Sequence, residues 1–333
     1  VMKKTAEIFI IGIPVVIILS ILILGITLSF TPKPLFKIAG VVPIEANLTK
    51  PDNYSTIDRN TRVEKNIIYS KNYSNSSLDI YSPKKSKGKV PVVLFIHGGG
   101  FFKGEKEMAK YFGPTISDNQ YAFISINYDL VPNVTVFDQV KQVNEAIIFI
   151  KENADKYSLD INNINLSGSS AGGFLALQLL SAYCDKDYAE ALKVTPVGTI
   201  KFNSLLLYSA VYDLSEFQNF DGNNFTGYLL SKMGWGLTGE KNWKTNKKLG
   251  ELLNLNNYVS GDFPPFFITD GNTNTFTEQA ENYVNELGHK QVPVQTLFFD
   301  LKEKVGHGYQ LKMDTPASKQ AVKESLEFLN KWN

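Results

Sequence analysis

Short apolar runs and longer amphipathic stretches alternate along most of the chain. The stretches at 136–157, 174–180 and 276–288 have the composition and apolar spacing of helices. Apolar, β-prone runs that are typical of buried strands lie at 90–96, 122–127, 161–166, 202–209, 264–269 and 292–299. Such an alternation of strand and helix predicts an α/β fold, with a mostly parallel central sheet and helices on both faces.

Two regions depart from this pattern. The runs at 63–69 and 77–81 mix polar with apolar residues, and we expect them to be half-exposed edge strands. A long insertion at 215–262, rich in Phe, Leu and Trp, separates two of the buried strands. We expect this insertion to form a lid-like wall of a pocket, and the alternative is an ordinary helical excursion packed on the core.

The N-terminal part of the chain predicts attachment to a membrane. Residues 8–30 carry no charge and are long and apolar enough to span a bilayer as a helix. The short basic N-terminus at 1–7 favours a single-pass protein of the cell membrane, with its catalytic domain outside the cytoplasm. Residues 31–62 are polar and contain proline, which predicts a stalk or a cap segment over the active-site mouth. The remaining residues, 63–333, are expected to form one catalytic domain.

A G-x-S-x-G pentapeptide at 168–172 follows the predicted strand 161–166 and precedes the helix 174–180. A serine at such a strand-to-helix turn is held in strained backbone with its Oγ exposed, and the flanking glycines leave room for the tight turn. We therefore predict that Ser170 is a nucleophile.

A run of H-G-G-G at 97–100 follows the buried strand 90–96. Consecutive glycines allow backbone N–H groups to surround an anion without interference from side chains, which is what an oxyanion hole requires. The candidate oxyanion donors are the N–H groups of Gly98, Gly99, Gly100 and Ala171.

With these two motifs the chain resembles the α/β-hydrolase family over residues 62–333, in particular the esterase and lipase branch related to hormone-sensitive lipase. The stretch N-Y-D-L-V-P at 127–132 is similar to a D-Y-R-L-A-P stretch of that branch. The resemblance implies an α/β-hydrolase fold and ester hydrolysis without a cofactor. One departure is Ser169, where relatives often carry Asp, and we expect it to alter the support of the turn more than the chemistry.

The chain has three histidines, and their positions select the general base. His97 belongs to the oxyanion loop, where we expect it to brace the loop by hydrogen bonding. His289 lies at the end of the helix 276–288 and is expected to be solvated. His307 lies in a glycine-flanked loop before the last helix, and the chain order serine, acid, histidine is the order of this fold. His307 is therefore the predicted base.

The acid of the triad has competing candidates. The resemblance places it at Asn274, after the strand 264–269, where an amide oxygen can orient the imidazole but supplies no charge. Asp270 at the end of the same strand is the other leading candidate. Glu278 and Asp213 are further alternatives, although a similar residue to Asp213 caps a helix in relatives.

Composition excludes several classes of function. The net charge is +1, from 34 basic and 33 acidic residues without a clustered basic face, so we expect no nucleic-acid partner. Three scattered histidines and one cysteine cannot build a zinc site of the usual kind, and we expect no metal and no organic cofactor.

Together these features predict a membrane-anchored serine hydrolase that cleaves small-molecule carboxylic esters through an acyl-enzyme on Ser170, with His307 as general base. The alternatives are a serine peptidase or amidase of the same fold, and a catalytically weakened surface binding protein.

Overall fold

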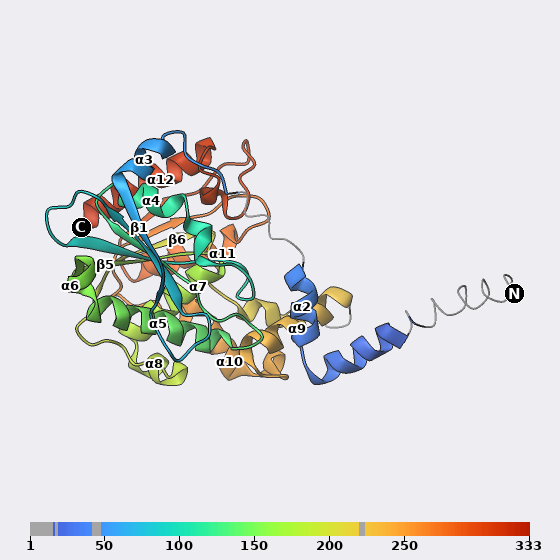
Figure 1. Cartoon of the computed structure of the whole chain (residues 1–333). Helices are drawn as coiled ribbons and strands as arrows, with labels where there is room; N and C mark the ends of the chain where they lie inside the picture. The colour runs from blue at the N-terminus through green and yellow to red at the C-terminus, as the bar shows by residue number, and fades with distance from the viewer. Residues whose placement is uncertain (1–15, 17–18, 42–47, 220–223) are drawn as a thin grey trace, which may run out of the picture.

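The computed structural model describes residues 16, 19–41, 48–219 and 224–333. Its centre is an eight-stranded sheet in the order β1-β2-β4-β3-β5-β6-β7-β8 (Figure 1). β2 runs antiparallel to both β1 and β4, and every other neighbouring pair is parallel. The predicted mostly parallel sheet is therefore confirmed. The strands are β1 (Thr61–Ile68), β2 (Ser77–Pro83), β3 (Val90–Ile96), β4 (Ala122–Ile126), β5 (Leu159–Ser169), β6 (Phe202–Tyr208), β7 (Phe266–Thr269) and β8 (Val294–Leu297).

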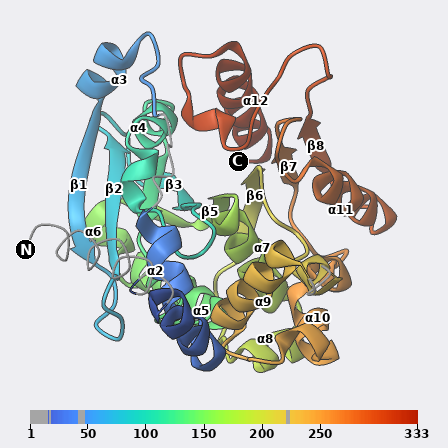
Figure 2. The same ribbon diagram turned by 90° about the vertical axis from the view of Figure 1, so that its right-hand side faces the viewer.

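Helices cover both faces of the sheet, as predicted (Figure 2). One face packs against α5 (Val136–Glu152), α7 (Ala171–Cys184) and α11 (Thr277–His289). The other packs against α4 (Phe112–Ser117) and α12 (Pro316–Trp332). The helix starts follow local sequence signals, since α5 begins with a capping box of Thr135 and Asp138. Shorter helices are α3 (Tyr54–Asn60), α6 (Ala154–Tyr157), α8 (Lys186–Leu192) and the 3₁₀ turns η1 (Lys106–Ala109) and η5 (Tyr309–Leu311).

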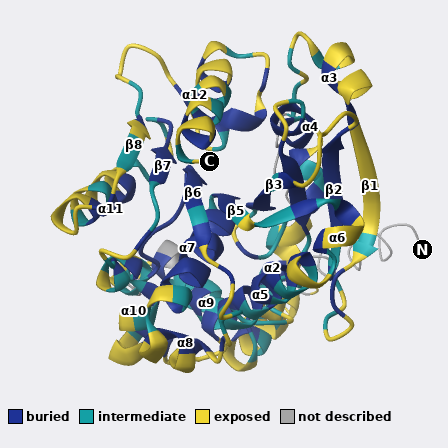
Figure 3. Cartoon of the chain, turned by 90° about the vertical axis from the view of Figure 1, so that its left-hand side faces the viewer, coloured by how far each residue is buried: buried dark blue, intermediate teal, exposed yellow. Residues whose placement is uncertain are grey.

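The expectation that 77–81 forms an edge strand is wrong. β2 lies between β1 and β4 and is buried along almost its whole length, whereas β1 at the edge is mostly exposed (yellow in Figure 3). The polar residue that made this run look half exposed is Asp79, which is fully buried. Its carboxylate lies 3.1 Å from the buried Nζ of Lys106, so an internal ion pair compensates the burial of its charge.

Two other expected elements differ in length. The helix predicted at 136–157 is interrupted at Asn153, whose backbone leaves the helical region (φ −110°, ψ 14°) and whose side chain donates to the carbonyl of Phe149. The strand predicted at 161–166 continues as β5 through Ser169, so the sheet leads directly into the G-x-S-x-G turn.

The insertion at 215–262 folds into a set of short helices, apart from residues that lie outside the described ranges. They are η2 (Ser215–Asn219), α9 (Phe225–Thr238), η3 (Trp243–Thr245), α10 (Lys247–Leu253) and η4 (Leu255–Tyr258). Helix α9 packs against η3 and reaches over the carboxyl ends of the central strands (Figure 2).

The predicted membrane span at 8–30 lies partly, and the basic segment at 1–7 wholly, outside the described residues. The described part contains a helix, Leu19–Phe30, followed by α2 (Lys33–Val41) after a bend of 120°. Among the residues that are described, no single helix has both the length and the apolar composition to cross a membrane, and only this bent pair meets the two criteria together. Within the segment predicted as a stalk or cap, α2 packs against α9 (Figure 1).

Candidate active site

Ser170 occupies the turn between β5 and α7. Its φ of 55° lies in the left-handed region, which is strained for a residue other than glycine and is typical of a nucleophile elbow. The Ser170 N–H donates to the carbonyl of Tyr208 on β6 at 2.9 Å. The turn fits closely under the neighbouring strand, because a Cβ at Gly172 would lie 2.1 Å from the carbonyl oxygen of Ile96. The predicted elbow is thus present in the backbone.

The H-G-G-G loop borders this elbow. A Cβ at Gly98 would lie 3.1 Å from the Cβ of Ser170. Gly99 and Gly100 have φ values of 120° and 62°, so the loop turns back through backbone conformations that favour glycine. Ala171 is the first residue of α7, where backbone N–H groups have no partner within the helix and the helix dipole favours an anion. Gly98 and Ala171 thus lie beside Ser170, and Gly100 lines the same cavity as Ser170.

His97 braces the oxyanion loop, as the sequence predicted. Its ring stacks on Tyr128 with 4.3 Å between ring centroids, and its Nδ1–H donates to the carbonyl of Gly98 at 2.7 Å. The Tyr128 hydroxyl donates to the carbonyl of His97 at 2.8 Å. Complete burial lowers the pKa of His97 to about 4, so this imidazole is neutral at pH 7.

His307 meets Asp270 through a third side chain. The His307 Nδ1 lies 3.0 Å from the Thr275 Oγ1, and the Thr275 hydroxyl donates to Asp270 Oδ1. A threonine hydroxyl has a single proton, so a hydroxyl that donates to the carboxylate can only accept from the imidazole. The network therefore assigns the proton of neutral His307 to Nδ1 and leaves Nε2 free to accept one.

Asp270 lies at the carboxyl end of β7 and is fully buried. It accepts hydrogen bonds from the N–H groups of Gly271 at 2.7 Å and Phe276 at 3.1 Å. Burial raises the pKa of Asp270, whereas hydrogen bonds from Thr275 and Ser209 and the charge of His307 oppose the rise. Burial also lowers the pKa of His307, and the carboxylate of Asp270 opposes that fall. The two groups are therefore linked electrostatically without direct contact.

Two hydrogen bonds tie the segment that carries His307 to its surroundings, one to the residue after β6 and one to the elbow. The N–H of Gly308 donates to the Ser209 Oγ at 3.2 Å, and Ser209 directly follows the residue whose carbonyl holds the Ser170 N–H. The side-chain amide of Gln310 donates to the Ser169 Oγ at 2.8 Å in a buried position. This bond ties Ser169, and with it the turn, to the segment that follows His307.

The other candidate acids do not lie in this network. Asn274 is exposed and takes a left-handed turn conformation with a φ of 52°. Glu278 is exposed in the first turn of α11. The Asp213 carboxylate accepts from the N–H of Ser215 at 2.7 Å, where η2 begins, as its capping interpretation predicted. The remaining histidine, His289, lies at the end of α11. Its side chain is exposed, and its Nδ1 is 3.7 Å from Oε2 of Glu286.

Sequence reasoning missed Thr275, Ser209 and Gln310. Ser209 follows the carboxyl end of a central parallel strand, where functional groups gather in such sheets, so its position was a usable signal. Thr275 and Gln310 lie in turns without periodicity, and no pattern in the sequence distinguishes them.

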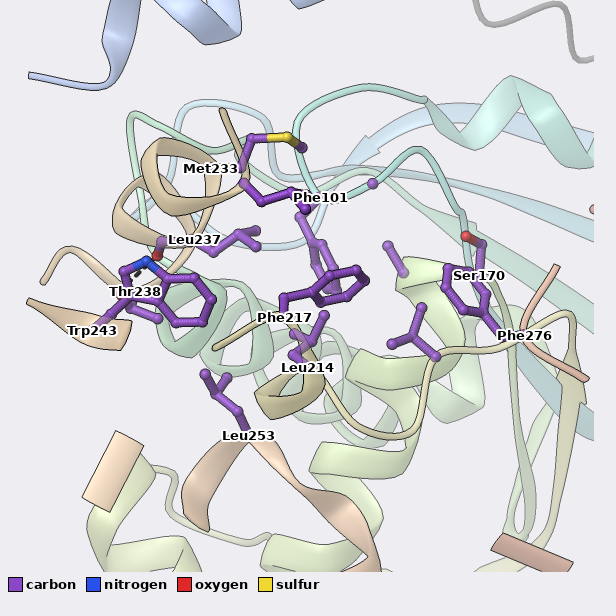
Figure 4. Close-up of a pocket in the computed structure, with 15 residues that line it drawn as sticks. Phe101, Ser170, Leu214, Phe217, Met233, Leu237, Thr238, Trp243, Leu253 and Phe276 are labelled. Atoms are coloured by element: carbon purple, nitrogen blue, oxygen red, sulfur yellow. Dashed lines mark hydrogen bonds between the residues drawn. The ribbon is translucent and has the colours of Figure 1, made fainter. Parts of the chain in front are cut away.

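An apolar cavity of about 210 Å³ borders Ser170. Ser170 and Phe276 lie at one end, and Leu237 and Trp243 lie at the other (Figure 4). The Phe276 ring also meets His307 edge-on, with 5.5 Å between centroids. The lining consists of Gly100, Phe101, Ser170, Ala171, Val211, Leu214, Phe217, Leu230, Met233, Gly234, Leu237, Thr238, Trp243, Leu253 and Phe276. The lining positions of α9 follow helical spacing, so one face of this helix walls the cavity.

Comparison with known proteins agrees with this geometry. The BD-FAE family model matches residues 78–286, more than half of the chain. Isoprenylcysteine alpha-carbonyl methylesterase of Arabidopsis thaliana is 29% identical over 126 residues, which are 38% of this chain and 29% of the plant protein.

Two solved structures have the same fold. Esterase B from Lactobacillus rhamnosus superposes with a TM-score of 0.74 at 21% identity, over 86% of this chain and 88% of that chain. A bacterial heroin esterase superposes with a TM-score of 0.66 at 19% identity, over 90% of this chain and 96% of that chain. The chain belongs to the BD-FAE family, and it is a carboxylic ester hydrolase, a serine esterase of the α/β-hydrolase fold.

Proposed function

We propose that Ser170 attacks the ester carbonyl while His307 removes the proton of its hydroxyl through Nε2. The resulting oxyanion receives hydrogen bonds from the N–H groups of Gly98, Gly99, Gly100 and Ala171, and each such donor is typically worth about 3 kcal/mol. His307 then returns the proton to the leaving alcohol, and the acyl-enzyme on Ser170 is hydrolysed by water activated in the same way.

The third member of the triad in this proposal is Asp270, which acts across the hydroxyl of Thr275. The observation that carries the proposal is the hydrogen-bond chain from Asp270 through Thr275 to His307 Nδ1. A negative charge at this distance still favours the imidazolium, because Asp270 is buried where solvent does not screen it. Asn274 is exposed and serves the turn, so we assign it no catalytic role.

The substrate class follows from the cavity. Its lining is almost entirely apolar, and its volume of about 210 Å³ is below the roughly 300–1,000 Å³ of sites for drug-sized ligands. This favours esters with a short acyl chain, whose carbonyl carbon meets Ser170 while the chain fills the space beneath α9. The related esterase B has also been captured with a tributyrin phosphonate inhibitor.

The test compares two acid variants with p-nitrophenyl butyrate as substrate. Asp270→Asn should lower kcat about 10³- to 10⁴-fold, because it removes the charge that supports the imidazolium. Asn274→Ala should change kcat by less than about threefold. The reverse ranking would reject the assignment of the acid. A fluorophosphonate probe should label wild-type enzyme and not Ser170→Ala, and failure to label the wild type would indicate an inert site.

The N-terminal segment supports attachment to a cell membrane, with the catalytic domain outside the cytoplasm. The support is the uncharged run at 8–30 and the short basic segment before it. Protease added to intact cells should remove the esterase activity from their surface, whereas full protection of the activity would contradict this orientation.

A further inference from the structure

The helix Leu19–Phe30 buries Leu28 on one side and exposes large apolar side chains on the other. Six of its large apolar residues are more than half exposed, from 52% at Leu19 to 78% at Phe30, and they also include Ile21, Leu22, Ile23 and Ile26. Leu19, Leu22, Ile23, Ile26 and Phe30 follow helical spacing and form one exposed apolar stripe, on the side of the helix opposite the buried Leu28. A contiguous exposed apolar surface of this kind marks contact with another protein or with lipid.

The outer face of α2 continues this surface and adds positive charge. Lys33, Lys37 and Val41 are spaced by four residues, which places them on one face of the helix, and all three are exposed. Ile38, also exposed, lies beside them. Residues 8–44 contain no acidic residue. A helix that presents lysines together with apolar side chains is typical of helices that lie in the headgroup region of a membrane.

The inner face of α2 contacts the wall of the acyl pocket. Phe36 is buried and packs edge-on against Phe102, which follows the oxyanion loop, with 5.4 Å between ring centroids. Phe36 also packs on α9 at Gly236, where a Cβ would lie 2.1 Å from the Phe36 ring. The same helix also supplies Met233 and Leu237 to the cavity. A single helix therefore separates the cavity from α2.

Further cations lie on the outer side of α9. The Nζ of Lys232 lies 5.4 Å from the ring centroid of Trp235, and the Nζ of Lys241 lies 5.6 Å from it. Basic side chains stacked on a partly exposed tryptophan suit the interface between lipid headgroups and hydrocarbon. The basic character of this side thus extends from α2 across the outer face of the pocket wall.

The bend and the charge of the N-terminal pair fit a lipid surface better than a second copy of the chain. The 120° bend lets this helix enter the bilayer while α2 lies along its surface. A second copy would bring the same lysines together, and like charges oppose that contact.

We propose that helix Leu19–Phe30 and the outer face of α2 dock on a lipid surface that carries anionic headgroups, and that docking presents the acyl pocket to esters dissolved in that lipid. The substrate part of this inference rests on the serine-esterase function proposed above. Docking explains why the apolar surface lies on the side of the domain that holds the pocket wall, since α2 and α9 are in contact there.

The test uses the full chain with vesicles of phosphatidylcholine alone or mixed equally with phosphatidylglycerol. Flotation should recover the wild type with the mixed vesicles. Lys33→Glu with Lys37→Glu should weaken this partition at least about 30-fold, from the loss of two headgroup contacts. The matched control is Lys186→Glu with Lys323→Glu, which reverses two charges that are exposed on α8 and α12. It should float like the wild type.

A second pair, Ile38→Asp with Val41→Asp, tests the apolar part of the surface. It should also reduce flotation, whereas hydrolysis of dissolved p-nitrophenyl acetate should stay within about twofold of wild type in both pairs, because none of the four residues lines the cavity. Butyrate release from tributyrin held in the mixed vesicles should fall together with flotation.

The outcomes separate the two proposals. The docking proposal is overturned if both double variants float with the vesicles as well as the wild type does. It is also overturned if the wild type dimerises through Ile38 and Val41 and does not bind vesicles. Unchanged butyrate release by variants that no longer float overturns the link between docking and substrate. A wild type that floats yet hydrolyses neither ester refutes the esterase function and leaves the docking result standing.

Discussion

The nucleophile side and the base side of the active site are built in different ways. Around Ser170 the positions are set by backbone: a strained turn, a neighbouring carbonyl and glycines with no room for a Cβ. Around His307 they are set by side chains, because Thr275, Asp270 and Ser209 form a polar network in which Asp270 and Ser209 lie at the ends of two strands. The first arrangement permits few residue types, whereas the second can be made from many.

This difference decides which substitutions are tolerated. A backbone-built turn fails when any side chain is added, since the surrounding atoms are main chain and cannot rotate away. A side-chain network can be rebuilt around a shifted acid, and here the proposed acid, Asp270, is connected to the imidazole through the hydroxyl of Thr275. We therefore expect variants of the two sides to fail in distinguishable ways.

The largest effect should come from the two reacting side chains. Ser170→Ala and His307→Ala should each lower kcat for p-nitrophenyl butyrate by at least about 10⁴-fold, because both act as one unit. The double variant should be no worse than either single variant. Additive losses in the double variant would show that the two residues act independently.

The backbone-built side should respond next, through stability. Gly172→Ala should lower the free energy of unfolding by about 3 kcal/mol or more, because its Cβ would overlap the carbonyls of Ile96 and His97. Gly306→Ala on the base side has open space and should stay within about 0.5 kcal/mol of wild type. Thermal and urea unfolding measure both. Equal stability of the two variants would show that the nucleophile side tolerates an added Cβ as well as the base side does.

The threonine bridge should give an intermediate effect on turnover. Thr275→Val removes the acceptor for His307 Nδ1–H and the donor to Asp270, and should lower kcat about 10- to 100-fold. Thr275→Ser keeps the hydroxyl and should stay within about threefold of wild type. Steady-state kinetics at several pH values measure both, and a Val variant as active as the Ser variant would reject the bridge.

The pH profile of activity distinguishes the effect of the Thr275 hydroxyl from the effect of the negative charge on Asp270. Activity requires neutral His307 and is lost as the pH falls through its pKa, which burial lowers below the usual 6.5. The acid limb of kcat/KM should therefore lie below pH 6.5. In Asp270→Asn it should move to still lower pH, because the charge that raises the pKa of His307 is gone. In Thr275→Val the charge remains, so the limb should move less.

The smallest effect should come from the hydrogen bond between Gln310 and Ser169, which joins the base side of the active site to the nucleophile side. Ser169→Ala leaves the buried amide of Gln310 without its acceptor and should lower the free energy of unfolding by about 1 kcal/mol, with little change in kcat. Differential scanning calorimetry measures the stability. A large loss of kcat would indicate that this bond also positions the reacting groups.

The sequence predicted the backbone-built side almost completely. The elbow and the oxyanion loop depend on glycine, and a requirement for glycine leaves a pattern that can be read in one sequence. The parallel sheet was equally predictable, because strands buried on both faces appear as continuous apolar runs. The burial of β2 was not, since the ion pair of Asp79 with Lys106 joins residues from separate elements.

The acid that we propose, Asp270, was not predictable for the same reason. Spacing along the chain selected Asn274 and Asp270 equally well, and only the three-dimensional position of the Thr275 hydroxyl distinguishes them. The role of the insertion was also left open by its composition. The apolar face of α9 walls the cavity, but Phe and Leu residues in a core-packing helix would have looked alike in the sequence.

The part of the cavity wall that α9 supplies is separate in the chain from both halves of the chemistry. Leu230, Met233 and Leu237 all belong to α9, and none of them is a member of the polar network described above. An engineer who wishes to change the accepted acyl length can therefore vary these three codons alone. Bulkier residues there should shorten the preferred chain and smaller ones lengthen it, while the bond-breaking groups keep their places.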